Sequence, residues 1–223
     1  VEFNLSRDGT SRFRGEKRWG LFPSFSLGWN MARESFWQPL EQYVNTFKPR
    51  FSYGSLGNQN TDNWYPTYSL QNITVGTPDV GGRWLLGDGS SKSNIASSPA
   101  LVSSLLTWER ITSYNYGLDF GASRNRLTGY FDYFVRNTDD MVGPAEELPP
   151  IVGASAPRTN NTSIQTKGWE LQVSWRDRIG DFGYNATFNL SDSRTWVTKY
   201  PNPGKNLTYV DENGSTKDNL LER

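Results

Sequence analysis

The chain has 223 residues with 23 basic and 23 acidic side chains, and it contains neither cysteine nor histidine. The lack of both residues excludes Ser-His-Asp triads, cysteine nucleophiles, Cys/His zinc sites and disulfide frameworks. A net charge of zero gives no general attraction to nucleic acid. The chain contains no run of about 18 apolar residues, which is the length that a helix needs to cross a bilayer. No signal peptide is recognised at Val1, and no glycine-rich phosphate-binding motif occurs. We expect no cofactor and no metal site, and any hydrolytic chemistry would have to rest on carboxylates alone.

The segment from residue 182 to residue 191 alternates apolar and polar side chains without interruption, which predicts a β-strand with two unlike faces. Its apolar residues are Phe182, Tyr184, Ala186, Phe188 and Leu190. The same alternation recurs along the chain and predicts an all-β protein. In chain order the predicted strands cover residues 1–7, 21–31, 47–55, 113–123, 127–137, 168–176 and 182–191, the last extending toward Lys199.

Two kinds of connection join the predicted strands. Tight turns are predicted at Arg124-Asn125-Arg126 and around Arg178-Ile179-Gly180, and residues 32–46 are predicted to form a short helix with Ser35 as its cap and a break at Pro39. The other connections are long and rich in Gly, Ser, Asn and Pro, and they cover residues 8–20, 56–112 and 138–167 and the tail after residue 199. If the chain reverses at every strand, all the long segments fall on one side of the sheet.

This sidedness is typical of outer-membrane barrels, which have short periplasmic turns and long extracellular loops. Trp175 and Phe182 flank one predicted turn, where their rings would lie at the headgroup level of a membrane. The same rings could also lie at the edge of a soluble core. The pattern favours a transmembrane barrel and leaves a soluble β-sandwich open, because both put an apolar face opposite a polar one.

Seven short motifs occur in order along nearly the whole chain. They are RDGTSRF at 7–13, RWGLFPSFSLGW at 18–29, FSYGSLGNQN at 51–60, LTWE at 106–109, GLDFG at 117–121, DYFVRNTDDMV at 132–142 and KGWEL at 167–171. Together they resemble the C-terminal half of the barrel of a SusC/RagA-type TonB-dependent outer-membrane transporter. The resemblance implies about seven strands of a larger plugged barrel, roughly 22 strands in all, with long extracellular loops. It also implies a location in the outer membrane of a Gram-negative, Bacteroidota-like bacterium.

The resemblance further implies a nutrient importer that takes up oligosaccharides or peptides, and thus transport rather than enzymatic activity. The partners that it implies are a SusD-like surface lipoprotein at the extracellular mouth, the TonB complex acting through the plug region, and the lipid of the outer membrane. No nucleic acid is expected as a partner. The alternative from another class is a soluble surface β domain that binds glycans through its long loops.

We interpret residues 1–223 as a partial TonB-dependent transporter β-barrel domain. No plug domain and no TonB box are recognised, and Arg223 is not the aromatic end that is usual in such barrels. Bacterial single-chain barrels close with an even number of strands, and unpaired strand edges are not tolerated in lipid. The odd number of predicted strands therefore indicates a fragment.

Two groups of residues are candidates for function. Amides, a carboxylate and rings at the start of the longest loop could contact cargo, or they could only order the loop; they are Asn58, Asn60, Asp62, Trp64 and Tyr65. Charged side chains on the predicted polar faces would line a wet lumen or touch the plug, and they are Glu2, Arg50, Asp119, Asp132, Arg136, Glu170 and Arg176.

Overall fold

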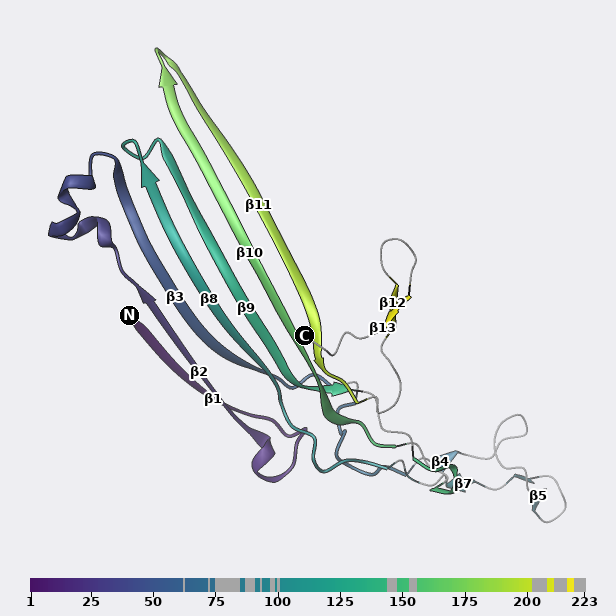
Figure 1. Ribbon diagram of the computed structural model, residues 1–223. Coiled ribbons are helices and arrows are strands. Elements are labelled where there is room, and N and C mark those ends of the chain that lie inside the picture. The colour runs from purple at the N-terminus through teal and green to yellow at the C-terminus, as the bar shows by residue number, and fades with distance from the viewer. Residues whose placement is uncertain are drawn as a thin grey trace.

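Seven long antiparallel strands lie side by side in one sheet (Figure 1). The computed structural model describes residues 1–61, 63–71, 73–74, 85–86, 91–92, 94–96, 99, 101–143, 148–152, 156–201, 208–210 and 216–218. The strands, in their order across the sheet, are β1 (Glu2–Gly9), β2 (Trp19–Gly28), β3 (Val44–Asn58), β8 (Glu109–Ala122), β9 (Leu127–Gly143), β10 (Thr159–Ile179) and β11 (Phe182–Lys199). All seven predicted strands are confirmed, and the hairpins β8–β9 and β10–β11 share this one sheet, as the barrel interpretation requires.

The remaining elements are short. Two-residue and three-residue strands pair as β4 (Ile73–Thr74) with β7 (Ile95–Ala96), β5 (Leu85–Leu86) with β6 (Ser91–Lys92), and β12 (Thr208–Val210) with β13 (Thr216–Asp218). The 3-10 helices are η1 (Gly15–Arg18), η2 (Met31–Arg33), η3 (Ser35–Leu40) and η4 (Pro150–Val152). In the described parts of the chain, no helix is long and apolar enough to cross a membrane. The described residues also contain no second large sheet, so the structure gives no support to the sandwich alternative.

The strand register joins the apolar side chains into one continuous face. One row of aligned residues runs across five strands as Pro49, Leu118, Phe131, Leu171 and Leu190. The adjacent row, shifted by one residue in each strand, points to the opposite face and is Lys48, Asp119, Tyr130, Gln172 and Asn189. Because no other described part of the chain covers the apolar face, large side chains on it stay open, and Phe188 is 60% exposed.

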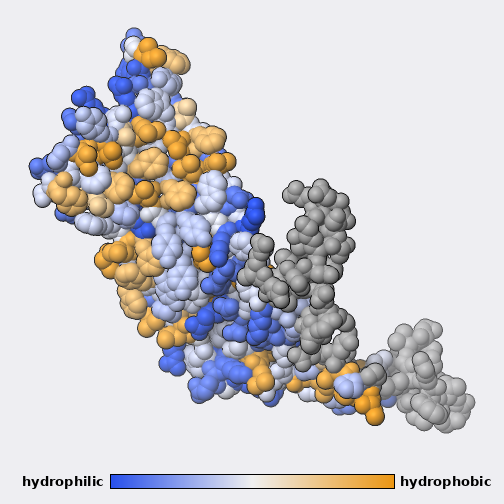
Figure 2. Space-filling model, viewed as in Figure 1, coloured by the Kyte–Doolittle hydropathy of each residue, from blue (hydrophilic) through white to orange (hydrophobic). Residues whose placement is uncertain are grey.

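The apolar face is bounded along the strands. On β10 it begins at Trp169 and ends at Trp175, and the same face carries Lys167 two residues before and Asp177 two residues after these rings. Asp177 forms an ion pair with Arg126 at 3.3 Å. Aromatic residues at both limits of an apolar band of this kind match the girdles of outer-membrane barrels. In Figure 2 hydrophobic residues cover much of the sheet toward its tight-turn end, and hydrophilic residues gather toward the other end.

The strands extend further than predicted at the end opposite the tight turns. β10 starts at Thr159 rather than at residue 168, and its added residues pair with both β9 and β11. Side chains on both faces of this extension are mostly polar, so the sequence has no alternation there. Backbone hydrogen bonds continue the ladder regardless of side-chain polarity. We call this end, where residues 10–18, 59–108 and 144–158 connect the strands, the long-loop end.

The tight-turn end carries the short connections. Residues 123–126 join β8 to β9, with positive φ angles of 53°, 58° and 60° at Ser123, Arg124 and Asn125. Residues 180–181 join β10 to β11, where Gly180 has a φ of 61° that a glycine adopts without strain. The second turn is therefore one residue later than predicted, because Ile179 still belongs to β10.

The predicted helix over residues 32–46 is wrong. The chain forms η2 and η3 instead, and β3 has already begun at Val44. Ser35 is the first residue of η3, and the N-cap position is occupied by Glu34, so Ser35 does not cap the helix. Glu34 makes no side-chain capping hydrogen bond either. The indole of Trp37 donates to the carbonyl of Val44 at 2.9 Å and stacks on Phe47 at 5.0 Å between ring centroids. These contacts, with Pro39 unable to donate a hydrogen bond, hold a tight loop rather than a regular helix.

Candidate functional site

The polar face brings together three of the predicted charged residues. Arg50 on β3 lies 2.9 Å from a carboxylate oxygen of Asp119 on β8 and 3.1 Å from one of Asp132 on β9. The guanidinium also donates hydrogen bonds to both carboxylates. The side chain of Asp132 is 13% exposed, whereas those of Arg50 and Asp119 are about one-third exposed. One cation therefore serves two carboxylates, and the cluster keeps a net charge of minus one.

A glycine makes this three-strand cluster possible. Arg50 pairs with Gly117 on β8, and Gly117 pairs with Asp132 on β9, so the three residues form one row across the sheet. A Cβ atom at Gly117 would lie 2.8 Å from Cζ of Arg50 and would also collide with a carboxylate oxygen of Asp132. Because Gly117 has no side chain, the guanidinium can cross over β8 to reach β9.

The other predicted lumen-facing residues lie on the same face but apart from this cluster. Glu170 pairs with Asp132 in the register, Arg136 pairs with Thr166, and Arg176 pairs with Asn185 nearer the tight turns. None of the three makes an ion pair within the described ranges. A shallow cavity of about 240 Å³ lies along the polar face beside Asp132, Arg136 and Glu170. That this face lines a lumen remains a prediction.

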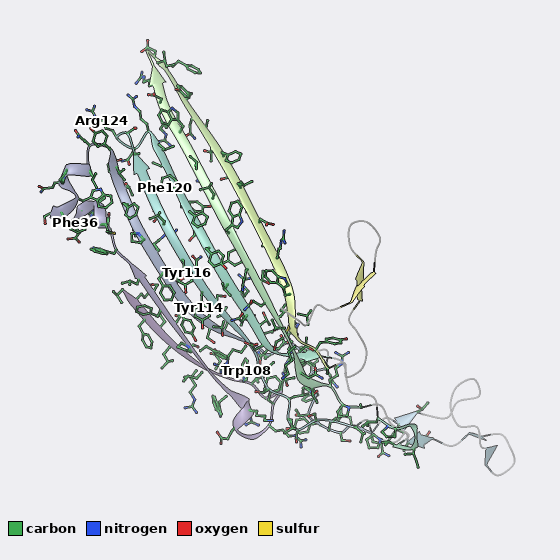
Figure 3. The ribbon with its side chains drawn as sticks, in the orientation of Figure 1. Phe36, Trp108, Tyr114, Tyr116, Phe120 and Arg124 are labelled. Atoms are coloured by element: carbon green, nitrogen blue, oxygen red, sulfur yellow. The ribbon has the colours of Figure 1, made fainter. Side chains whose placement is uncertain are left out.

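A small buried core lies at the long-loop end. It consists of Phe13, Phe22, Leu106 and Trp108, which are 1 to 9% exposed. The ring of Trp108 meets those of Phe13 and Phe22 edge to face at 5.9 and 5.5 Å, and its indole N–H donates to the carbonyl of Arg18 at 3.3 Å. Trp108 is far from Phe36 and Arg124 at the tight-turn end (Figure 3). The core packs the connection before β2 against the segment before β8.

Three polar side chains fasten the loops around this core. The amide of Asn160 accepts from the backbone N–H of Thr107 at 2.9 Å and donates to the Thr107 carbonyl at 3.0 Å. Glu109 accepts from the Asn58 amide at 2.7 Å and from the Val142 backbone N–H at 3.1 Å. The third is Arg12, which donates to the carbonyls of Gln59 and Thr61. Sequence analysis missed these roles, although several of the residues lie in the quoted motifs, because their partners are distant in sequence.

The predicted cargo residues are placed around the same loops. Asn58 lies at the end of β3, where its side chain also accepts from the backbone N–H of Asn60 at 2.9 Å. Asn60 lines a cavity of about 400 Å³. Trp64 and Tyr65 are 73% and 57% exposed. These contacts of Asn58 order the loop, and Asp62 lies outside the described residues. A role of the five residues in cargo binding remains a prediction.

Comparison with known proteins identifies the family. The family model described as "TonB dependent receptor-like, beta-barrel" matches residues 2–221. The chain is 29% identical over 214 residues to the TonB-dependent receptor SusC of Bacteroides thetaiotaomicron, covering 94% of this chain and 20% of SusC. It is 30% identical over 202 residues to the TonB-dependent receptor P3 of Formosa agariphila, covering 89% of this chain and 19% of that receptor.

Solved structures agree in fold. A chain of the RagAB peptide importer in its open-open state has a TM-score of 0.74 and 24% identity, with 95% of this chain and 21% of that chain covered. The closed-closed state gives a TM-score of 0.71. The chain thus spans about a fifth of the length of its relatives. Its sheet, its sidedness and its sequence place it among the TonB-dependent receptor β-barrels, and it belongs to that family as a barrel segment of the SusC/RagA type.

Proposed function

We propose that this chain is part of the wall and the extracellular mouth of a TonB-dependent nutrient importer in the outer membrane. The observation that carries the proposal is the seven-stranded sheet with one continuous apolar face, one polar face, both tight turns at one end, and the longest connections at the other. The apolar face contacts lipid, the polar face lines the lumen, and the long-loop end is extracellular. The protein acts in transport and not in catalysis.

The cargo is an oligosaccharide or a peptide. Membership of the SusC/RagA type supports this range, and RagAB is itself named a peptide importer. In this proposal a SusD-like lipoprotein covers the long-loop end, and TonB supplies energy through the plug region. The cluster of Arg50, Asp119 and Asp132 then lies on the inner wall, where a plug or passing cargo can meet it.

The lipid assignment is tested by cysteine labelling of the full-length protein in its membrane. Leu118→Cys is on the apolar face, and Gln172→Cys is on the polar face in the adjacent row. We expect Leu118→Cys to react only with a membrane-dissolved thiol reagent and Gln172→Cys to react with a water-soluble one. Residues 1–223 contain no cysteine, so they add no background labelling by the thiol reagents. A Leu118→Cys protein that reacts with neither reagent has a packed core at this position, which would contradict the proposal.

Import is tested separately in cells. Uptake of labelled oligosaccharides and peptides is compared between cells with and without the full-length protein, and again after the inner-membrane proton gradient is collapsed. We expect uptake to require both the protein and the gradient. Uptake that persists without the gradient would exclude a TonB-dependent importer.

A further inference from the structure

The connection between β1 and β2 is strongly basic in a chain that is neutral overall. Residues 7–18 carry five cationic side chains and two acidic ones, a net charge of plus three. The cations are Arg7, Arg12, Arg14, Lys17 and Arg18, and the acids are Asp8 and Glu16. One of the acids, Asp8, accepts a hydrogen bond from the Ser6 hydroxyl at 3.0 Å. The positive charge is therefore concentrated at the long-loop end.

The buried Phe13 lies between two of these arginines and anchors their segment to the core at the long-loop end. Phe13 is 1% exposed and packs against Trp108. Residues 11–13 form a turn and a bend, and the backbone is extended at Arg14, with φ of −106° and ψ of 151°. The Arg14 side chain is exposed, and that of Arg12 is half-buried. The fully buried Thr67 donates its hydroxyl to the Arg12 carbonyl at 3.1 Å, which draws residues 64–68 alongside.

Each of the two arginines lies over an aromatic ring of this neighbouring segment. Cζ of Arg12 is 4.4 Å from the centroid of the Trp64 ring, and Cζ of Arg14 is 4.2 Å from that of Tyr68. Tyr65 meets Tyr68 edge to face at 6.1 Å. The rings remain open to solvent, with Trp64 73%, Tyr65 57% and Tyr68 42% exposed. We call Arg12, Arg14, Trp64, Tyr65 and Tyr68 the arginine–aromatic platform.

The two guanidinium groups differ in what they have left to bind. Arg12 donates to Gln59 and Thr61, so it mainly holds the loop. Arg14 has its stacking contact with Tyr68, and it forms no hydrogen bond or ion pair with any residue that the structure describes. A stacked guanidinium keeps its N–H groups at its edge, in the geometry that binds a carboxylate with two hydrogen bonds. Arg14 is thus positioned to receive an anion beside exposed rings.

We propose that the arginine–aromatic platform binds a carboxylate-bearing sugar ring, so that the cargo is an acidic oligosaccharide. This inference rests on the import function proposed above. A uronic acid residue combines in one unit an apolar ring face, which stacks on an exposed aromatic ring, and a carboxylate, which an arginine binds. The acidic side chains of a peptide carry the carboxylate but have no ring face to cover Trp64. The platform therefore fits the sugar better than an acidic peptide.

The test measures binding to the purified full-length protein. The probes are oligomers of galacturonate, mannuronate and glucuronate, each with a methyl-esterified and therefore neutral counterpart, and tetraglutamate. We expect at least one acidic oligosaccharide to bind about tenfold more tightly than its ester, the worth of one charge-assisted contact. Arg14→Gln should reduce that ratio to near one, and Trp64→Ala should weaken both the acid and the ester. Arg124→Gln, an exposed arginine at the tight-turn end, is the matched control and should bind as the wild type does.

The outcomes separate this inference from the proposed import. If no acidic oligosaccharide binds better than its ester, or if Arg14→Gln keeps the preference, the inference is wrong. Tetraglutamate could also bind as tightly as the acidic sugars and depend on Arg14. That result would assign the platform to acidic peptides and would also overturn the inference. Gradient-dependent uptake of neutral cargo with no preference for acids would refute the inference and leave the importer intact. Arg14-dependent binding without uptake would support the platform and refute import.

Discussion

The middle of the sheet and its long-loop end are held together in different ways. In the middle, which we call the wall, apolar side chains form a face that none of the other residues described by the structure covers, and Phe188 stays 60% exposed. At the long-loop end, Phe13, Phe22, Leu106 and Trp108 come from segments far apart in the chain and exclude solvent from one another. The wall leaves its apolar side chains open, whereas the long-loop end has a buried core.

This difference shows that the two regions depend on different surroundings. Apolar surface stabilises a fold only when it leaves water, so the wall needs apolar surroundings, which in our proposal are lipid. The long-loop end buries its own rings and should keep its packing without lipid. Mutations in the two regions should therefore respond differently to position and to medium, and four substitutions in the full-length protein test this.

The largest effect is expected for Trp108→Ala at the long-loop end. Removing this ring leaves a cavity between Phe13 and Phe22 and should cost about 3–5 kcal/mol. Hydrogen exchange of the amides in residues 10–18 and 103–108 measures the loss locally, and Tyr43→Ala, which removes a 65% exposed ring at the tight-turn end, is the control. Equal acceleration of exchange across β8 to β11 would mean that wall and long-loop end unfold as one unit, contrary to the comparison.

The next largest effect is expected for Leu118→Arg in the wall. A cation facing lipid near the bilayer midplane should destabilise the barrel by about 2–4 kcal/mol, and one near an interface by about 0–1 kcal/mol. Phe182→Arg, beside a tight turn, provides the shallow position. Unfolding of the protein in lipid vesicles measures both. Similar costs at the two positions would show that depth in a membrane does not govern this face.

The same difference between the wall and the long-loop end determines how much of the fold could be predicted from the sequence. All seven strands could be found because an apolar face opposite a polar one requires strict alternation, as in residues 182–191. The alternation ends where both faces meet water, so the extension of β10 back to Thr159 could not be found. The turn over η2 and η3 was predicted as a regular helix because the packing of Trp37 on Phe47 is not visible in sequence.

The site was predictable to a similar degree. Alternation alone assigned Arg50, Asp119 and Asp132 to the polar face, but their grouping depends on the register of three strands and on the missing side chain of Gly117. The core at the long-loop end was not predicted, because Phe13 and Trp108 lie in loops without periodicity and the alternation of β2 gives no partner for Phe22. Their signal is the occurrence of Phe13 and Trp108 within the quoted motifs, which gives no partner for either ring.

A smaller effect is expected for Arg50→Gln on the polar face of the wall. The substitution leaves Asp119 and Asp132 without their shared cation. Because the cluster is partly exposed, we expect a cost of about 1–2 kcal/mol rather than that of a fully buried pair. Unfolding of the double variant Arg50→Gln/Asp132→Asn should recover part of the loss, as residues in one network are not additive. A double variant whose cost is the sum of the single costs would show that the pair is not coupled.

The smallest effect is expected for Asp119→Asn, which neutralises the more exposed carboxylate of the cluster. The Asp119 side chain is 34% exposed, compared with 13% for Asp132, and Arg50 keeps its contact with Asp132. A solvated ion pair contributes about 0–1 kcal/mol, so we expect a cost in that range, and a larger one for Asp132→Asn. Unfolding in lipid vesicles measures both variants, with Gln172→Asn in the same polar row as the control. A wet inner wall predicts that added salt weakens the Asp119 contribution further. A cost above about 2 kcal/mol that salt does not change would mean that another part of the protein covers Asp119 and excludes water. The polar face of the wall would then be packed like the long-loop end.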